Sequence, residues 1–216
     1  MMRVRINFDK TEEMRFTSHL DMYRTWERTL RRACLPLAYT QGYKPHPRLQ
    51  IAAALPLGFT SSNDLIDLWL EQDIPISTIQ ACIEAALPPG IKLNSIHAVP
   101  INQPSLQALL MASEYRITFL EAITDLEQRV QTIIQKPSVI IERKGKPRDL
   151  RPLILSIEIF LDSGSRHQGI QVLLKTDPAN HARPDELILA MGIAPEKAVF
   201  HRQKLYFSQE IGASQS

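Results

Sequence analysis

The chain has 216 residues, of which 44% are hydrophobic and 22% charged, and its formal net charge is +2. This length suits one large domain or two small ones, and the composition excludes a disordered or collagen-like chain. The small net charge does not require nucleic acid as a partner, although it leaves room for a local basic face.

Cysteine content and hydropathy exclude several other classes of protein. Cys34 and Cys82 are far apart and have no cysteine or histidine at metal-ligand spacing, so we expect no zinc or iron–sulfur site and no metal in this chain. The N-terminal stretch lacks the apolar segment of a signal peptide, and no apolar run reaches the length of a membrane span. The sequence thus predicts a cytoplasmic protein without a membrane partner.

The first hundred residues carry alternating strand and helix patterns. Residues 3–8 alternate apolar and polar side chains, as in a half-buried strand, and residues 18–34 form a helical stripe that Ser18 caps. The next segments predict a core strand, a second strand, a helix and a last strand, at residues 50–57, 65–70, 76–87 and 91–99. This order is typical of the ferredoxin-like split βαβ arrangement.

The same order of elements restarts after a polar segment and a short helical stretch at 105–113. We expect strands at 115–120, 139–141, 153–161, 169–175 and 198–207, and helices at 125–135 and 183–191. The predicted fold class is therefore α+β, with two tandem ferredoxin-like halves and antiparallel sheets. The predicted parts are an N-terminal half at 1–100, a connector at 101–113, a C-terminal half at 114–208 and a flexible tail at 209–216.

A short basic and aromatic loop, Tyr43-Lys44-Pro45-His46-Pro47-Arg48, follows the first helix. Its two prolines fix their own φ and bias Lys44 and His46 toward extended conformations, so the loop presents its side chains rigidly. We expect a recognition loop that faces the first helix, in which Tyr43 stacks on an unpaired base.

Arginines of the first helix accompany this loop. Arg24 and Arg28 lie among several cations at helical spacings, which suits contact with phosphates. The alternative is a merely solvated helix face, in which Asp21 pairs with Arg24 and Glu27 with Arg31.

A second basic group lies in the C-terminal half, at Arg143, Lys144, Lys146 and Arg148. A strand-connecting loop this basic suits phosphate contact, or else the charges protect a hairpin tip from edge association. Arg183 precedes a proline and two acids that are explained by their place in a first helical turn, which leaves Arg183 itself as a candidate ligand contact.

Two histidines are candidates for acid–base chemistry. His19 lies at a helix N-terminus beside Asp21, and His46 lies between two prolines. Histidine is the usual acid–base side chain near neutral pH, but no nucleophile or further base of standard spacing accompanies this pair. The alternative is that His19 is a surface residue of a first turn and His46 a residue of a rigid turn.

The run MRFTSHLDMYRTWERTLRRACLPLAYTQGYKPHPRLQIAAALPLG, residues 14–58, resembles the start of the radical-SAM-linked domain of unknown function DUF2344. RKGKPRDLRPLI and ARPDELILAMG resemble later segments of that family. The resemblance implies a bacterial domain that stands alone or is fused to the C-terminus of radical SAM proteins. By position it stresses Ser18, His19, Asp21, Gln41, Gly42, Pro45, His46, Pro47 and Arg48.

A radical SAM enzyme holds its cluster with three cysteines, and this chain has two. The resemblance therefore implies that the iron–sulfur cluster and SAM belong to a partner radical SAM protein, with no cofactor in this chain. The leading hypothesis is a non-catalytic accessory domain that presents a substrate, with RNA as the candidate. The alternatives are a stand-alone RNA-cleaving or RNA-modifying enzyme that uses His19 and His46, and a protein-binding scaffold.

Overall fold

The computed structural model describes residues 1–143, 145–161, 167–176 and 182–208, and shows a mixed α+β fold with antiparallel strand pairing. It divides into two compact units, Met1–Leu109 and Leu110–Ser216. The tail predicted at 209–216 lies outside the described residues. None of the helices in the described ranges has the length and hydropathy needed to cross a lipid bilayer.

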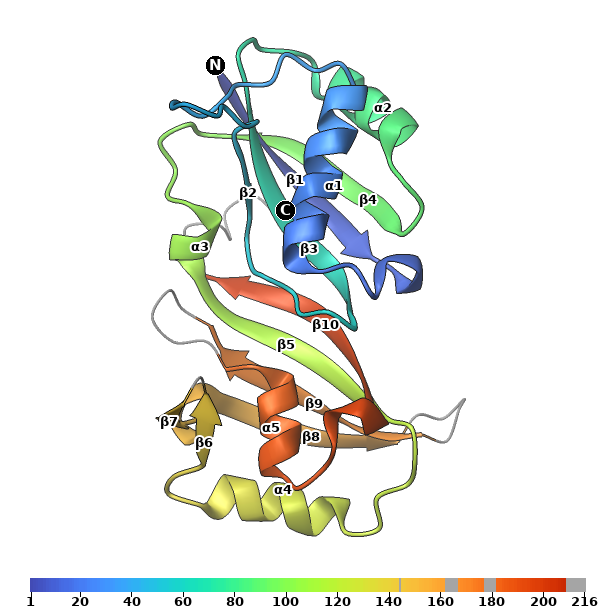
Figure 1. Cartoon of the computed structure of the whole chain (residues 1–216), viewed down its shortest axis with the longest axis vertical. Helices are drawn as coiled ribbons and strands as arrows, with labels where there is room; N and C mark the ends of the chain where they lie inside the picture. Colours follow the sequence, from blue (N-terminus) through green and yellow to red (C-terminus); the bar gives the residue numbers. More distant parts are fainter. Residues whose placement is uncertain (144, 162–166, 177–181, 209–216) are drawn as a thin grey trace. The chain divides into compact units, whose positions relative to one another are not determined.

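The first unit is a four-stranded sheet with two helices packed against it (Figure 1). Its strands lie side by side in the order β4-β1-β3-β2, and all neighbours are antiparallel. A short helix, α3, is the last element of this unit. The elements in chain order are β1 (Met2–Lys10), α1 (His19–Arg32), β2 (Leu49–Ile51), β3 (Phe59–Leu70), α2 (Ile76–Ala86), β4 (Ile91–Val99) and α3 (Leu106–Leu109).

The core of this unit follows from the alternation along β1. Val4, Ile6 and Phe8 lie on the helix side, where they join Trp26 and Leu30 of α1, and all five are at most 1% exposed. The rings of Phe8 and Trp26 meet edge to face, with centroids 4.9 Å apart. Because side chains alternate along a strand, Arg3 and Arg5 of β1 lie on the opposite face of the sheet.

The second unit repeats this order of elements with an inserted hairpin. Its sheet has the strand order β10-β5-β9-β8, and β6 and β7 form a separate two-stranded ladder. The elements are β5 (Leu110–Phe119), α4 (Leu126–Gln135), β6 (Ile140–Arg143), β7 (Lys146–Asp149), β8 (Ile154–Leu161), β9 (Gln168–Lys175), α5 (Pro184–Ala190) and β10 (Ala198–Phe207).

Three predicted elements differ from the structure. The strand expected over 50–57 ends at Ile51, and the residues that follow are irregular although Leu55 remains buried. The strand expected to begin at residue 65 begins at Phe59. The helix expected over 105–113 ends at Leu109, because the following residues pair with β9 and β10 as part of β5.

Candidate nucleic-acid interface

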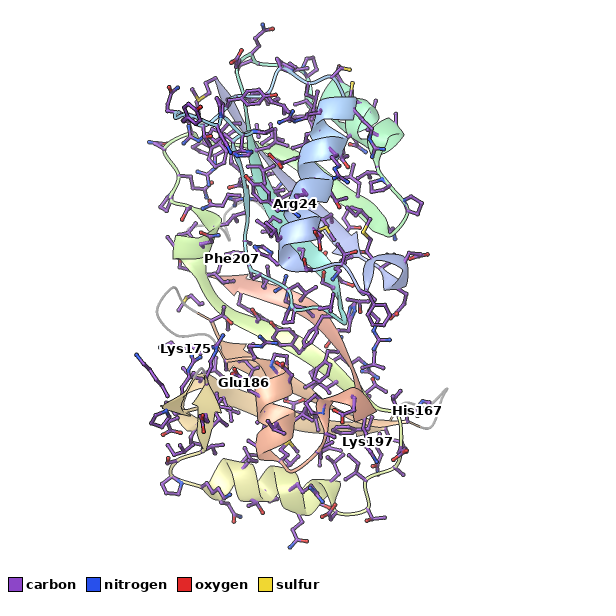
Figure 2. The ribbon with its side chains drawn as sticks, in the orientation of Figure 1. Arg24, His167, Lys175, Glu186, Lys197 and Phe207 are labelled. Atoms are coloured by element: carbon purple, nitrogen blue, oxygen red, sulfur yellow. The ribbon has the colours of Figure 1, made fainter. Side chains whose placement is uncertain are left out.

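The exposed side of α1 is basic. Ser18 caps the helix by accepting a hydrogen bond from the Asp21 backbone N–H at 3.2 Å, as predicted. Arg24, which Figure 2 labels on α1, lies 3.5 Å from Asp21, and this pair confirms one of the two ion pairs expected on the helix. Arg28 and Arg31 are also exposed, and within the described ranges neither has a carboxylate partner.

The loop Tyr43–Arg48 lies against this helix. His46 Nδ1 is 3.3 Å from Oε1 of Glu27, whose helical neighbours at i−3 and i+4 are Arg24 and Arg31. Tyr43 is 98% exposed, and Lys44 and Arg48 are exposed too. We call the exposed side chains Arg24, Arg28, Arg31, Tyr43, Lys44 and Arg48 the basic surface.

The basic surface concentrates positive charge in one part of the sequence. Residues 15–48 contain seven cationic and two acidic side chains, a local net charge of +5, whereas the whole chain carries +2. The remaining residues are therefore net acidic. An anionic polymer would be attracted to this surface in preference to the rest of the molecule.

Backbone hydrogen bonds hold the loop in place. The His46 carbonyl accepts from Thr40 N at 2.8 Å, and His46 N donates to Thr40 Oγ1 at 3.1 Å. Arg48 N donates to the Ala38 carbonyl at 2.7 Å. Together with Pro45 and Pro47, these bonds fix the course of the backbone between the two ends of the loop.

The structure separates the two candidate catalytic histidines. His19 is the first residue of α1, and it lines a small cavity with Lys10 and Asp64. His46 contacts Glu27, which is eight residues further along the helix, or about 12 Å at 1.5 Å per residue. His19 thus lies at the start of α1, whereas His46 contacts the helix about two turns further along.

In the second unit, two of the predicted ligand residues, Arg143 and Arg183, have protein partners of their own. Arg143 Nε lies 3.3 Å from Glu186 Oε1, on α5, where Figure 2 labels Glu186. Arg183 makes two hydrogen bonds to Asp185, at 3.0 and 2.7 Å, which supplies the structural reason that sequence reasoning did not find.

Of the three remaining cations of the hairpin, the two that the structure describes differ in exposure. Lys146 is exposed, whereas Arg148 is half-buried and pairs in register with Ile141. Lys144 lies outside the described residues. Asp149 ties the base of the hairpin, since its Oδ1 accepts from the backbone N–H groups of Val139 and Arg151, and these bonds lower the pKa of its carboxyl.

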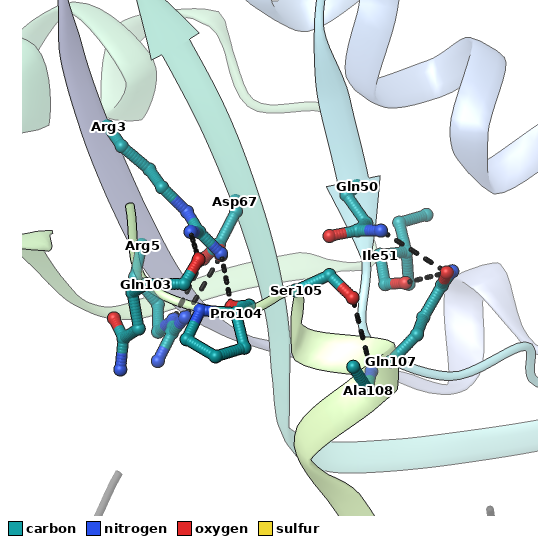
Figure 3. A network of polar contacts seen from close by, with 10 residues as sticks. All are labelled: Arg3, Arg5, Gln50, Ile51, Asp67, Gln103, Pro104, Ser105, Gln107 and Ala108. Carbon is teal, nitrogen blue, oxygen red and sulfur yellow. Dashed lines mark hydrogen bonds and ion pairs between the residues drawn. The ribbon is translucent and has the colours of Figure 1, made fainter. Parts of the chain in front are cut away.

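Sequence reasoning missed a buried ionic network on the far face of the first sheet (Figure 3). Arg3 and Arg5 of β1 both bond to Asp67 of β3, and their side chains are 2%, 2% and 0% exposed. Arg5 Nε and Nη2 lie 2.8 and 3.0 Å from the two carboxylate oxygens, and Arg3 Nε lies 3.0 Å from Oδ2. Arg3 also donates to the carbonyls of Gln103 and Pro104.

One signal in the sequence could have located this network. Asp67 interrupts the otherwise apolar run Leu65–Leu70, and a carboxylate in such a strand needs a cationic partner on the same face. The pairing register supplies two such partners, because Arg5 lies opposite Asp67 on the neighbouring strand and Arg3 is two residues away.

The register extends the network to both edges of the sheet. His97 of β4 lies opposite Arg5. Desolvation lowers the pKa of His97, the charge of Arg5 lowers it further, and Asp67 acts in the opposite direction. His97 is therefore biased toward its neutral form.

A pocket of about 390 Å³ adjoins this network. Arg3 and Arg48 both place their guanidinium carbons over the ring of Trp69, at 4.9 and 4.4 Å from its centroid. Trp69 is 7% exposed. Gln103 and Ser105, which precede α3, line the pocket as well. Arg48 thus connects this pocket, which lies on the sheet face opposite α1, with the loop Tyr43–Arg48.

Comparison with known proteins gives one family and several similar solved structures. The model of a family described as uncharacterised proteins conserved in bacteria, DUF2344, matches residues 3–184. A search of curated proteins found no match. A similar solved structure is the crystal structure of the archaeal box H/ACA sRNP Nop10–Cbf5 complex, with a TM-score of 0.43 and 13% identity. The match covers 92% of this chain and 46% of that chain, so this chain spans less than half of its length.

Proposed function

The chain belongs to the DUF2344 family of uncharacterised bacterial proteins, and on that premise we propose that it is an accessory domain that binds single-stranded RNA for a partner radical SAM protein. The observation that carries the RNA part is the contact between His46 and Glu27, at 3.3 Å. This contact joins the exposed loop Tyr43–Arg48 to the basic helix α1, so that both contribute to one surface.

The charge of the basic surface supports phosphate contact. Arg28, Arg31 and Lys44 are exposed, and none of them has a carboxylate partner among the residues that the structure describes. Cations that are not already neutralised within the protein can replace the counterions of a nucleic acid, which favours binding at low salt.

Tyr43 supports the choice of a single-stranded ligand. The ring is 98% exposed at the tip of a loop that two prolines hold in place. A solvent-exposed aromatic ring beside cations is typical of proteins that bind single strands, because the ring can stack on an unpaired base. Bases in a duplex are already stacked on one another and cannot stack on the ring in this way.

We also infer that both units are ferredoxin-like. In each unit the first strand lies between the last and the third, and the second strand is at an edge, as shown by the orders β4-β1-β3-β2 and β10-β5-β9-β8. Each unit has one helix between its first two main-sheet strands and one before its last. These orders support the split βαβ assignment, which by itself says little about function.

The radical SAM part rests on the sequence resemblance described above. The proposal assigns the cluster and SAM to the partner, because a radical SAM cluster needs three cysteines and this chain has Cys34 and Cys82 only. On this proposal the chain has no activity of its own. It holds the substrate while the partner performs the reaction.

The RNA part is tested by fluorescence anisotropy on the full chain. The probe is a labelled single-stranded RNA of about ten nucleotides, and the affinity is measured over a range of salt concentrations. We expect binding that weakens steeply with salt, is weaker for the duplex of the same sequence, and falls on Arg28→Gln with Lys44→Gln. The control is Lys92→Gln with Lys136→Gln, which removes the same charge from two exposed lysines outside the basic surface. Absence of binding, or equal loss in the control, would overturn the proposal.

The partner is tested separately by affinity purification of the full chain from its own cells after nuclease treatment. We expect a radical SAM protein among the co-purified proteins. If none is recovered with or without nuclease, the radical SAM part is wrong, whatever the RNA measurement shows.

A further inference from the structure

The pocket beside Trp69 carries more positive charge than its own groups neutralise. Arg3 and Arg5 are both 2% exposed and share the single carboxylate of Asp67, which leaves one uncompensated positive charge beneath the pocket. Arg48 adds a second, since it contacts Trp69 and the Met1 sulfur but no carboxylate in the described part of the chain. The buried charge is costly without a counterion, and the exposed Arg48 adds a second cation at the rim, so the pocket favours an anion of one to two charges.

Two polar atoms in the pocket walls lack hydrogen-bond partners in the described part of the chain. These are Nε1 of Trp69, whose side chain is 7% exposed, and the buried Oε1 of Gln103. Buried polar atoms in folded proteins are nearly always bonded to something. The indole N–H can only donate, whereas the amide oxygen can only accept, so a matching ligand offers both an anionic oxygen and a hydroxyl group.

The walls of the pocket are held by the rest of the first unit. Gln107 of α3 donates to the Ile51 carbonyl at 3.2 Å and accepts from Gln50 at 3.2 Å, so that α3 is tied to β2 (Figure 3). Arg3 holds the carbonyls of Gln103 and Pro104. The backbone segments that carry the pocket side chains are therefore held by bonds within the protein, which lowers the entropic cost of binding.

We propose that this pocket binds the terminal phosphate of an RNA strand together with its ribose. A terminal phosphate is a monoester and carries a charge of about −1.5 to −2 at pH 7, which matches the excess positive charge, whereas an internal phosphate carries one charge only. Arg48 and the Trp69 N–H donate to the phosphate oxygens, and Gln103 Oε1 accepts from a ribose hydroxyl.

The size and position of the pocket agree with this assignment. A volume of about 390 Å³ lies in the lower part of the range of small-molecule pockets and suits one nucleotide rather than a longer segment. Arg48 lines the pocket and is the last residue of the loop Tyr43–Arg48, which contacts α1 through His46. The inference rests on the proposed RNA binding, since the remaining nucleotides would follow that loop to the basic surface.

The experiment compares RNAs that differ only at their ends. One strand of fixed sequence is prepared with a 5′-phosphate, with a 3′-phosphate and with hydroxyls at both ends, and the affinity of each for the full chain is measured. We expect one phosphorylated form to bind about tenfold to a hundredfold more tightly than the hydroxyl form, as charge-assisted hydrogen bonds to a phosphate allow.

Two variants assign this preference to the pocket. Trp69→Phe removes the N–H and keeps an aromatic ring, and Gln103→Glu places a negative charge in the wall. Both variants should reduce the phosphate preference to less than about threefold, which corresponds to less than half of the free-energy difference between the phosphorylated and hydroxyl forms. Both should leave the affinity for the hydroxyl form nearly unchanged. Gln131→Glu on the exposed side of α4 makes the same charge change elsewhere and should preserve the preference.

The failure of this inference differs from the failure of the proposed function. If all three RNAs bind equally, or if Gln103→Glu preserves the preference, the pocket assignment is wrong and RNA binding stands. If no RNA binds but a nucleoside monophosphate does, and Gln103→Glu abolishes that binding, the phosphate site stands without the proposed function. If neither RNA nor nucleoside monophosphate binds, both are wrong.

Discussion

In both units the first strand sends polar side chains to the sheet face that lies opposite the apolar core, but the chemistry of those side chains differs. On β1, Arg3 and Arg5 share the carboxylate of Asp67, so that one positive charge of the group has no counterion. On β5, Glu114 accepts hydrogen bonds from Gln171 and from the Tyr206 hydroxyl, the latter at 2.8 Å. Its negative charge is thus solvated by neutral donors.

The comparison separates what strand order provides from what side chains provide. The same order of strands places polar residues of the first and third strands next to each other in each unit. In the first unit these residues adjoin a pocket with excess positive charge, and in the second they include Arg116 stacked on Phe160, with its guanidinium carbon 3.5 Å from the ring centroid. The identity of a few residues therefore decides whether this face carries excess positive charge beside a pocket or a stacked arginine.

The largest effect is expected from the shared carboxylate. Asp67→Asn leaves two buried guanidinium groups without a counterion and should lower the free energy of unfolding by about 3–5 kcal/mol. Glu114→Gln in the second unit removes an acceptor from neutral donors and should cost about 1 kcal/mol. Urea unfolding checks both, and similar losses would contradict the contrast between the two faces.

The two tryptophans make this measurement specific to the first unit. Trp26 and Trp69 both lie in residues 1–109, so intrinsic tryptophan emission follows that unit, while far-ultraviolet circular dichroism follows both. For Asp67→Asn, the emission midpoint should move to lower urea at least as far as the dichroism midpoint.

A smaller loss is expected from Gly169 in β9. A Cβ at this position would meet the Ile117 carbonyl oxygen and the Phe160 ring, neither of which can move without disturbing the sheet. Gly169→Ala should therefore lower the free energy of unfolding by about 1–3 kcal/mol. Gly145→Ala is the control, because its surroundings are open and only its φ of +74° is unfavourable, at about 1 kcal/mol. A greater loss for the control would show that the stacked face of the second unit tolerates the extra atom.

The basic loops of the two units should differ in their contribution to RNA binding. Lys44 and Arg28 have no carboxylate partner among the described residues, and removing both should reduce the slope of log affinity against log salt by about 1.4, at 0.7 per phosphate contact. Removing the hairpin's Lys146 and Arg148 should change the slope by less than half as much, since Arg148 is half-buried. Equal changes would indicate that RNA contacts both units equally.

The smallest effect is expected from His97. Its pKa lies below the ordinary value of 6.5, so the folded protein resists the proton that the unfolded chain accepts. The free energy of unfolding should therefore fall as the pH drops below about 6.5, and part of this fall should disappear in His97→Gln. Tryptophan-detected unfolding at several pH values checks this, and identical pH dependence in both proteins would contradict it.

Most elements of the fold could be predicted from the sequence because their patterns are local. The alternation of Val4, Ile6 and Phe8, and the Ser18 cap of α1, depend on neighbours in the chain. The strand predicted over 50–57 was wrong beyond Ile51 because a run of apolar residues marks burial, and an irregular segment can be buried as well as a strand.

The candidate site was predictable only in part, and for the same reason. The segment Tyr43–Arg48 was found because its residues are contiguous. The pocket joins Arg3, Arg48, Trp69 and Gln103 from four separate segments, so it required the register of β1 with β3. The partner of Arg143, Glu186, was missed because it lies on another element, and such pairing leaves no periodic pattern in the sequence. The partner of Arg183, Asp185, is only two residues away, but it was assigned to the first helical turn alone.

The hydrogen bonds of the loop Tyr43–Arg48 have a consequence for the kinetics of encounter. Thr40 and His46 are bonded to each other, and the Arg48 backbone N–H is bonded to the Ala38 carbonyl, so the loop is ordered by contacts within the protein. A segment that is already ordered need not fold while it binds, so association should proceed in a single step limited by collision and electrostatic attraction. Stopped-flow traces should then be single exponentials whose rate rises linearly with RNA concentration.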